Sequence, residues 1–261
     1  MRSATATGFL LACLLAVPLT AADLAPTGTL RAAFLRTNPV QGRIDPQTKS
    51  VTGPVADLVE ALARQLGIPY QIIPAADARE VIDDLNAHTA DIGFLAYDAP
   101  RAAEVDFSRP YALMQNSYLV RADSPIHKAS EADHAGFRIG AAQGQSQSVY
   151  LKENLKNAQV KILPAMPPPD ELQKMLVAGE LDAFGANRQR LIEVASAHKT
   201  VRVLPDNFSA AEQSIVITKG DRSRLELLNR FVNDACSSGL VKTSIDRAKL
   251  LGVDVAPSGI K

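Results

Sequence analysis

The sequence predicts an α/β fold of two similar lobes, each a mostly parallel sheet flanked by helices. Three observations support this prediction. Strands alternate with helices, the order β-α-β-α-β occurs twice, and a short sequence frame recurs at the same place in both copies. Such alternation is typical of a parallel sheet, because parallel strands need a crossover connection that is usually a helix.

The first copy begins with strand Leu30–Phe34. The following segment 54–66 has apolar residues at helical spacing: Val55, Leu58, Val59, Leu62 and Leu66. This spacing predicts a helix with one apolar face that begins at Pro54 and ends before Gly67. The rest of the copy is strand Tyr70–Ile73, a helix opened by the capping pair Asp77 and Glu80, and strand Asp91–Ala96.

The second copy repeats this order in five elements: strand Phe137–Ala141, helix Ser146–Leu155, strand Val160–Leu163, helix Asp170–Ala178 and strand Leu181–Phe184. The frame L-x-A-x-x-x-D stands before the last strand of each copy, at residues 85–91 and 176–182. A short frame recurs easily by chance, but its matched position in both copies favours a structural repeat.

Two strands are expected to cross between the lobes, at Tyr111–Arg121 and, after a terminal strand at Val201–Leu204, at Ser214–Thr218. Helices Asp221–Cys236 and Val241–Leu250 follow and are expected to pack on the first lobe. We therefore assign residues 23–113 and 212–261 to lobe one and 114–211 to lobe two, with the crossing strands at its edges. Ligands of open parallel sheets bind outside the carboxyl ends of the strands, so two facing lobes predict a cleft that closes by a hinge.

The composition excludes several functions. The 261 residues carry 28 basic and 28 acidic side chains without a basic cluster, so nothing favours nucleic-acid binding. The four His residues lack the spacing of metal ligands, and no G-x-S-x-G, Walker or paired-Cys motif is present. We expect no catalytic residue, no metal and no cofactor.

Residues 1–22 have the features of a secretory signal peptide: Arg2, a short apolar run from Phe9 to Val17, and small residues at the cleavage position. A lipoprotein signal at Cys13 fits less well, because the apolar stretch continues past it. The signal predicts a periplasmic protein. Cleavage leaves Cys236 without an internal disulfide partner, and we expect that side chain to be buried in the core.

From Asp91 onward the chain resembles the periplasmic solute-binding proteins of amino-acid-type ABC importers, family 3. The residues that carry the resemblance are Asp91-Ile92-Gly93-Phe94, Arg101, the D-F-S-R-P-Y element at 106–111, Gly53-Pro54-Val55-Ala56-Asp57-Leu58, and Gln143-Gly144-Gln145-Ser146. The resemblance implies the type II, Venus-flytrap fold and a monomer. It also implies that the protein delivers a small carboxylate or amino acid to a membrane permease.

The resemblance implies that Arg101 binds the ligand carboxylate, and a guanidinium matches a carboxylate with two parallel hydrogen bonds. The alternative is a surface Arg that pairs with Asp98 or Glu104. The resemblance also places Gln145 and Ser146 against the same carboxylate. They lie at the N-terminus of a predicted helix, whose unpaired N–H groups attract anions. The alternative for Ser146 is ordinary capping of that helix.

Other positions depart from the family pattern. Asn187 stands where typical amino-acid binders have an Asp for the α-ammonium group, so the charge partner is missing. The segment after Asp91 is short and lacks small hydroxyl residues, although the carbonyl of Ala96 could still accept a bond. Asn38 stands at a place that often provides an aromatic wall. Phe94 and Tyr97 could replace part of that wall, and the alternative for both is core packing.

Two other functions remain open. Cyclohexadienyl dehydratases are similar to these binding proteins, but the helix position at which they carry a Glu reads Arg188-Gln189-Arg190 here. A binding module that serves a sensor or an oxidoreductase instead of a permease is the other alternative.

Overall fold

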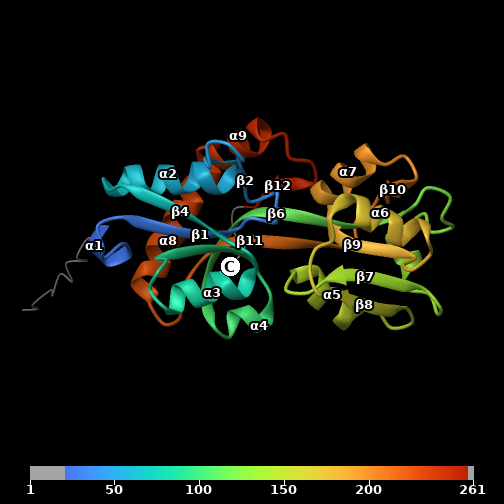
Figure 1. Cartoon of the computed structure of the whole chain (residues 1–261). Helices are drawn as coiled ribbons and strands as arrows, with labels where there is room; N and C mark the ends of the chain where they lie inside the picture. Colours follow the sequence, from blue (N-terminus) through green and yellow to red (C-terminus); the bar gives the residue numbers. More distant parts are fainter. Residues whose placement is uncertain (1–20, 258–261) are drawn as a thin grey trace, which may run out of the picture.

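The computed structural model describes residues 21–257, and most of their strands form a single sheet of ten (Figure 1). The strand order is β4-β1-β5-β11-β6-β9-β7-β8, and β10 and β12 each pair with β6. The predicted signal peptide, apart from its last two residues, lies outside the described residues. Helix α1 is Ala21–Leu24. No helix in the described range is both long and apolar enough to cross a membrane.

The first β-α-β-α-β unit forms one end of this sheet, which we name the β1 end. Its elements are β1 Leu30–Leu35, α2 Pro54–Leu66, β4 Tyr70–Ala75, α3 Ala78–Asn86 and β5 Ile92–Ala96. Strand β1 pairs in parallel with both β4 and β5, as the alternating pattern predicted. A short hairpin of β2 Arg43–Ile44 and β3 Val51–Thr52 precedes α2.

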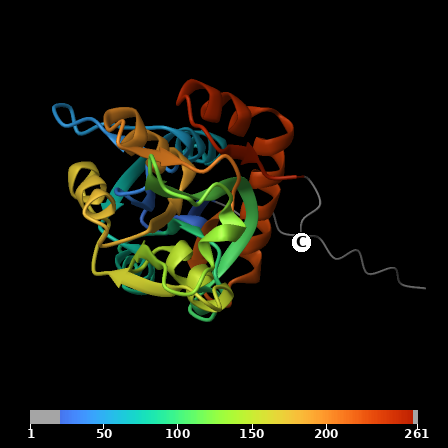
Figure 2. The same ribbon diagram turned by 90° about the vertical axis from the view of Figure 1, so that its right-hand side faces the viewer.

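The second unit forms the opposite end, the β7 end. It contains β7 Arg138–Ala142, α5 Ser146–Asn154, β8 Gln159–Leu163, α6 Pro169–Val177 and β9 Ala183–Asn187. Strand β7 pairs in parallel with β8 and β9, so the local order β8-β7-β9 mirrors β4-β1-β5. Viewed from this end, helices lie on both sides of the strands (Figure 2).

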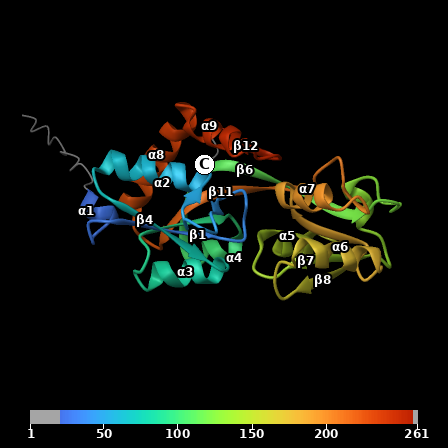
Figure 3. The same ribbon diagram turned by 45° about the horizontal axis from the view of Figure 1, so that its top comes forward.

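Two antiparallel strands join the ends. Strand β6, Val105–Arg121, pairs with β11, Ser209–Thr218, along its first part and with β9 along its last part. Figures 1 and 3 show these two long strands running between the β1 end and the β7 end. The crossing strand begins earlier than the predicted Tyr111, because the D-F-S-R-P-Y element at 106–111 is already part of β6. A bulge there leaves the amide of Ile215 to donate to Ser108 Oγ at 3.0 Å.

The remaining elements complete the chain. They are α4 Ala99–Ala102, the 3₁₀ helix η1 Ala129–Ala132, α7 Arg188–Ala197, β10 Val201–Val203, α8 Arg222–Ser237, α9 Leu240–Arg247 and β12 Val253–Val255. The expected strand at 181–184 is displaced to 183–187, because Asp182 is held in the preceding turn by Arg138. Helix α7 was not among the elements expected from periodicity. It follows β9 without a loop, and few of its residues are buried and apolar.

The apolar core is divided between the two ends. The clusters at the β1 end draw on residues 24–114 and 211–253, which include α8 and α9. Those at the β7 end draw on residues 118–204. Each end therefore buries its own apolar side chains.

Candidate functional site

Two cavities lie where the β1 end meets the β7 end. The larger, of 450 Å³, we name the α3 cavity; it is lined by Arg36, Thr37, Ala76, Asp77 and Arg79 on one side and Gln143, Gly144, Gln145, Pro164, Ala165 and Met166 on the other. The second, of 280 Å³, we name the α5 cavity; it is lined by Tyr97, Asp98, Ala99, Asn116, Ser146, Val149, Tyr150, Glu153, Ser209, Ala210 and Ala211. Both combine residues from the two ends of the sheet, near the carboxyl ends of strands.

Arg101 connects the two ends of the sheet. Its side chain is buried, with 7% of the residue exposed, and Nη2 donates to the carbonyl of Gly144 at 2.7 Å, across to the β7 end. Nη1 donates to the carbonyl of Ala96 at 2.8 Å, and Nε lies 3.1 Å from Asp98 Oδ2. The partners Gly144 and Asp98 line the α3 and α5 cavities, so Arg101 lies beside both.

Local sequence holds Arg101 in this position. Asp98 caps α4 by accepting the Arg101 amide at 2.8 Å, and the same carboxylate pairs with the guanidinium. Burial lowers the pKa of Arg101 and the charge of Asp98 opposes that change, but a guanidinium keeps its charge at any ordinary pH. The alternative to ligand binding was a surface Arg paired with Asp98 or Glu104. The pairing with Asp98 is present, but Arg101 is buried between the two ends and does not lie on a helix surface.

Gln145 and Ser146 stand at the N-terminus of α5, between the two cavities. Gln145 is the N-cap and lines the α3 cavity, while Ser146 is the first helical residue and lines the α5 cavity. No side chain caps this helix within the described residues, so the expected alternative of capping by Ser146 is not met. The N-terminal N–H groups of α5 lie beside the carbonyl that Arg101 holds.

Asn187 ends β9 and caps α7. Its side chain accepts a hydrogen bond from the amide of Arg190 at 2.9 Å, and 5% of the residue is exposed. Its pairing partner on β6 is Asn116, which lines the α5 cavity. The place expected to hold an ammonium group is therefore a buried, neutral amide at a helix start.

The other predicted residues are divided between core and surface. Phe94 is fully buried and packs edge-on against Tyr111, with ring centroids 6.0 Å apart, so its side chain fills the core and lines neither cavity. Ala96 contributes its carbonyl to Arg101. Tyr97 is 47% exposed, lines the α5 cavity and packs against Phe107. Asn38 is buried and accepts from the amide of Val40, which closes its own loop.

A chain of buried neutral side chains was missed by sequence reasoning. Gln147 donates to Asn116 at 2.6 Å, and Asn116 donates to Ser209, so α5, β6 and β11 are linked beside the α5 cavity. Gln41 and Gln213 form a second pair at the carboxyl end of β5, where Gln41 also donates to the carbonyl of Phe94. Isolated amides carry no sequence signal, because Asn and Gln are common on exposed surfaces.

Two further contacts join the ends of the sheet. Arg43, on the β2–β3 hairpin, pairs with Glu193 of α7. Gln189 Oε1 of the same helix accepts from the amide of Leu251 at 2.7 Å, which precedes β12. The described structure is thus a closed arrangement in which α4, the hairpin and the C-terminal segment all contact the β7 end.

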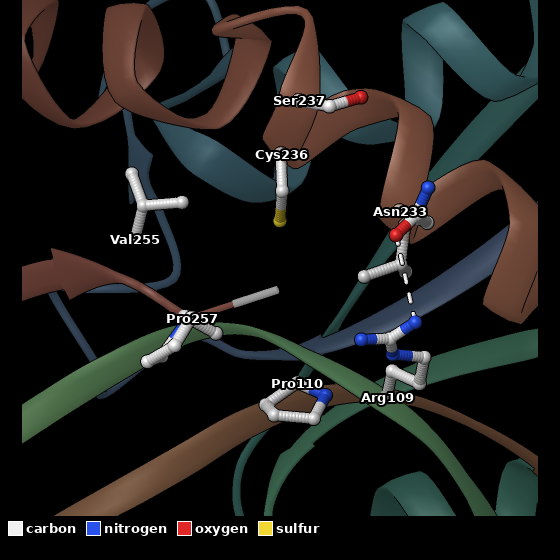
Figure 4. Close-up of a pocket in the computed structure, with 9 residues that line it drawn as sticks. Arg109, Pro110, Asn233, Cys236, Ser237, Val255 and Pro257 are labelled. Carbon is white, nitrogen blue, oxygen red and sulfur yellow. Dashed lines mark hydrogen bonds between the residues drawn. The ribbon is translucent and has the colours of Figure 1, made fainter. Parts of the chain in front are cut away.

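Two other cavities lie within the β1 end. The larger, of 530 Å³, lies between the hairpin, α2 and α9, where Asp57 already pairs with Arg247 and Ser244. The smaller, of 210 Å³, lies beside Cys236, Arg109 and Pro257 (Figure 4). Cys236 is half-buried at the edge of the core rather than within it, and burial raises the pKa of its thiol. Neither cavity receives residues from both ends of the sheet.

Solved structures share the fold. A Streptococcus pneumoniae amino acid ABC transporter substrate-binding protein bound to L-arginine matches with a TM-score of 0.71 at 19% identity, over 86% of this chain and 96% of that chain. An ancestral amino-acid-binding protein described as a precursor of cyclohexadienyl dehydratase matches at 0.70 and 22%, over 86% and 96%. A histidine kinase sensor domain matches at 0.71 and 19%, over 87% and 98%. At these identities the matches establish the fold alone.

No curated protein matches the sequence. The model of the bacterial extracellular solute-binding proteins, family 3, matches residues 30–247, which is most of the chain. The sheet order, the closed arrangement around Arg101 and this match lead to one conclusion: the chain belongs to the bacterial extracellular solute-binding proteins, family 3.

Proposed function

We propose that this chain is the periplasmic binding component of an ABC importer and captures a small carboxylate-bearing solute, an amino acid or a derivative of one. The observation that carries the proposal is the buried guanidinium of Arg101, which reaches across to the β7 end. A buried cation needs oxygen partners. Those of Arg101 are the Asp98 carboxylate and the neutral carbonyls of Ala96 and Gly144. A ligand carboxylate would replace a neutral carbonyl with a charged acceptor, and a charge-assisted hydrogen bond is stronger than a neutral one.

The ligand carboxylate would take the place of the Gly144 carbonyl on Arg101. The guanidinium donates two hydrogen bonds, to the carbonyls of Ala96 and Gly144, and forms an ion pair with Asp98, so its remaining N–H groups are available to a ligand. The N-terminal N–H groups of α5 approach the same position, because Gln145 and Ser146 follow Gly144 directly. Arg101 and α5 would then hold one anion from both sides.

Closure would occur about the strands that join the two ends. We propose that the β1 end, residues 23–113 and 212–261, and the β7 end, residues 114–211, are the two lobes. Strands β6 and β11 would act as the hinge, because β6 pairs with β11 along its first part and with β9 along its last part and so runs from one end to the other. The Arg101–Gly144 bond breaks when the lobes separate, so opening exposes the guanidinium to an incoming ligand.

The test compares ligand binding by the mature chain and by Arg101→Ala. The ligand-stripped protein is screened by thermal shift against amino acids, carboxylates without an amino group, amines and sugars, and the dissociation constant of each hit is measured. A ligand that binds the folded state raises the melting temperature. We expect carboxylate hits, and a loss of roughly 10-fold to 150-fold in Arg101→Ala, which corresponds to about 1.5–3 kcal/mol for hydrogen bonds to a charged group.

Arg64→Ala is the matched control. Arg64 lies on the exposed face of α2 and pairs with Glu60 of the same helix, so its removal takes away one positive charge without touching the cavities. Arg101→Lys keeps the charge but lacks the planar fork, and we expect an intermediate affinity. Equal affinities in wild type and Arg101→Ala, or hits confined to amines and sugars, would contradict the proposal.

A further inference from the structure

Asn187 lies beside the α5 cavity through its strand neighbour Asn116 and has no negative charge that could hold an ammonium group. Asn187 is neutral, is buried, and uses its side-chain oxygen to accept the amide of Arg190. It also caps α7, so the positive end of that helix dipole lies at the same place. A cation there would face an already bonded oxygen and an unfavourable dipole.

The charged side chains nearest in the chain are also unfavourable to a cation. The first turn of α7 contains Arg188 and Arg190 and no acidic residue. Arg188 Nη1 donates to the carbonyl of Leu204, and Arg190 Nη2 to the carbonyl of Pro167, so both guanidinium groups remain without a carboxylate. The nearest acid on α7, Glu193, already binds Arg43 and Gln189.

No other carboxylate of the described residues replaces the missing one in a buried position. Of the acids that line the two cavities, Asp98 is paired with Arg101, and Glu153 is exposed. Asp77 is exposed as well and uses one oxygen to cap α3. Among the buried residues in the described range, the charged ones are Asp91 and Arg101, and Asp91 is bonded to Arg31. A buried ammonium without a counter-charge is costly.

Neutral hydrogen-bonding groups occupy this region instead. Asn116, the strand neighbour of Asn187, is linked to Gln147 and Ser209. On the Arg101 side, Gln213 pairs with Ala96, is fully buried, and its Nε2 has no acceptor within the described residues. Amides of this kind bind hydroxyl and carbonyl groups without needing a charge.

We infer that the site selects a carboxylate whose α-substituent is uncharged, such as a 2-hydroxy acid, a 2-keto acid or an N-acylated amino acid, over the free α-amino acid. This inference rests on the proposed binding of a carboxylate by Arg101. It assigns Asn187, the strand neighbour of Asn116 beside the α5 cavity, as the residue that determines this specificity.

The test is a titration of the ligand-stripped mature chain with matched pairs of acids. The pairs are L-alanine with L-lactate, L-leucine with 2-hydroxyisocaproate, L-glutamate with 2-hydroxyglutarate, and L-arginine with N-acetyl-L-arginine. Within any pair that binds, we expect the acid without the ammonium group to bind at least tenfold more tightly. The titrations are repeated with Asn187→Asp, in which we expect that ratio to shift by at least tenfold toward the amino acid.

Asn187→Asp is a selective variant, because Asp and Asn cap helices equally well and α7 should keep its stability. An unchanged melting temperature of the ligand-free protein checks that expectation. Asn86→Asp adds the same charge at the exposed last residue of α3 and is the matched control, for which we expect the wild-type ratio.

The outcomes separate this inference from the proposed function. Amino acids that bind as tightly as their partners, or an unchanged ratio in Asn187→Asp, would overturn the inference and leave the carboxylate site in place. If no acid of any pair binds to the wild-type protein, the proposed carboxylate site is overturned and the inference falls with it.

Discussion

The β1 end and the β7 end contain the same turn structure, but the residues around that turn are buried to different degrees. In the turn at residues 85–91, after α3, the amide of His88 donates to Leu85 and that of Thr89 to Asp84, at 3.1 and 2.9 Å. In the turn at residues 176–182, after α6, Gly179 donates to Leu176 and Glu180 to Met175 at the same two distances. The backbone is left-handed at the matching positions, with φ of 55° at His88 and 70° at Gly179. The repeated L-x-A-x-x-x-D frame is thus one backbone structure formed twice.

The Asp that ends each frame makes the same three bonds. Asp91 accepts from the amide, Nε and Nη2 of Arg31, at 2.9, 3.0 and 2.7 Å. Asp182 accepts from the same three groups of Arg138, at 2.8, 3.0 and 3.3 Å. In both pairs the side-chain hydrogen bond raises the pKa of the Arg. Each pair ties the first strand of its unit to the last.

The pairs differ in what covers them. The side chain of Asp91 is 3% exposed, while that of Asp182 is 27% exposed. The cover at the β1 end comes from the C-terminal part of the chain, since Arg224 of α8 donates to the carbonyl of Asp91 at 2.7 Å. The same local motif can therefore contribute differently to the free energy of unfolding. Burial strengthens the ion pair and makes the loss of one partner more costly.

The largest expected effect is that of Asp91→Asn. This change removes the buried negative charge that faces Arg31 and leaves a partly buried guanidinium without its counter-ion. We expect the free energy of unfolding to fall by about 3 kcal/mol, the low end for a broken buried pair, because Arg31 keeps some exposure. The measurement is urea unfolding of the mature chain, read as a shift in midpoint at constant slope.

Asp182→Asn tests the same bond in the more exposed pair. We expect a loss of stability less than half of that in Asp91→Asn, because water can solvate Arg138 once the charge is gone. Salt should reduce the difference between wild type and this variant, whereas the Asp91 difference should change little. Equal losses in the two variants would show that burial does not distinguish the pairs.

The smallest effects are expected at the left-handed position of each turn. Gly179→Ala places a Cβ where only backbone strain opposes it, since no atom lies within 4 Å, and we expect a loss of about 1 kcal/mol. His88→Gly relieves the same strain in the other turn, and we expect a gain below about 1 kcal/mol. Thermal unfolding of the two variants checks the opposite signs, and two shifts of the same sign would break the equivalence of the turns.

Local pattern was sufficient for much of the fold. The helix at 54–66, the capping of α3 by Asp77 and the parallel pairing of both units follow from apolar spacing and cap chemistry, which act over a few residues. The start of β6 and the position of β9 were missed. Ser108 and Asp182 are fixed there by partners far away in the chain, at Ile215 and Arg138.

The candidate site could be predicted only in part, for a similar reason. Sequence resemblance identified Arg101, Gln145, Ser146 and Asn187, and the structure brings the first three around the Gly144 carbonyl. It could not show that Phe94 belongs to the core, because an apolar strand residue looks the same beside a ligand and beside Tyr111. The amides Gln147, Asn116 and Gln213 come from three separate elements and had no signal of their own.

The sequence by itself determined the alternation of strands and helices, the repeated turn and the family, because these depend on residue order and local hydrogen bonding. The tertiary structure alone decided that Arg101 is buried between the two ends and that the Asn187 amide caps α7. It also decided that the Asp91–Arg31 pair is more buried than the equivalent Asp182–Arg138 pair. Burial depends on what other segments pack against a residue. Helix α8 lies more than a hundred residues after Asp91 in the chain. Its Arg224 covers Asp91, and this cover is the reason that Asp91 is more buried than Asp182.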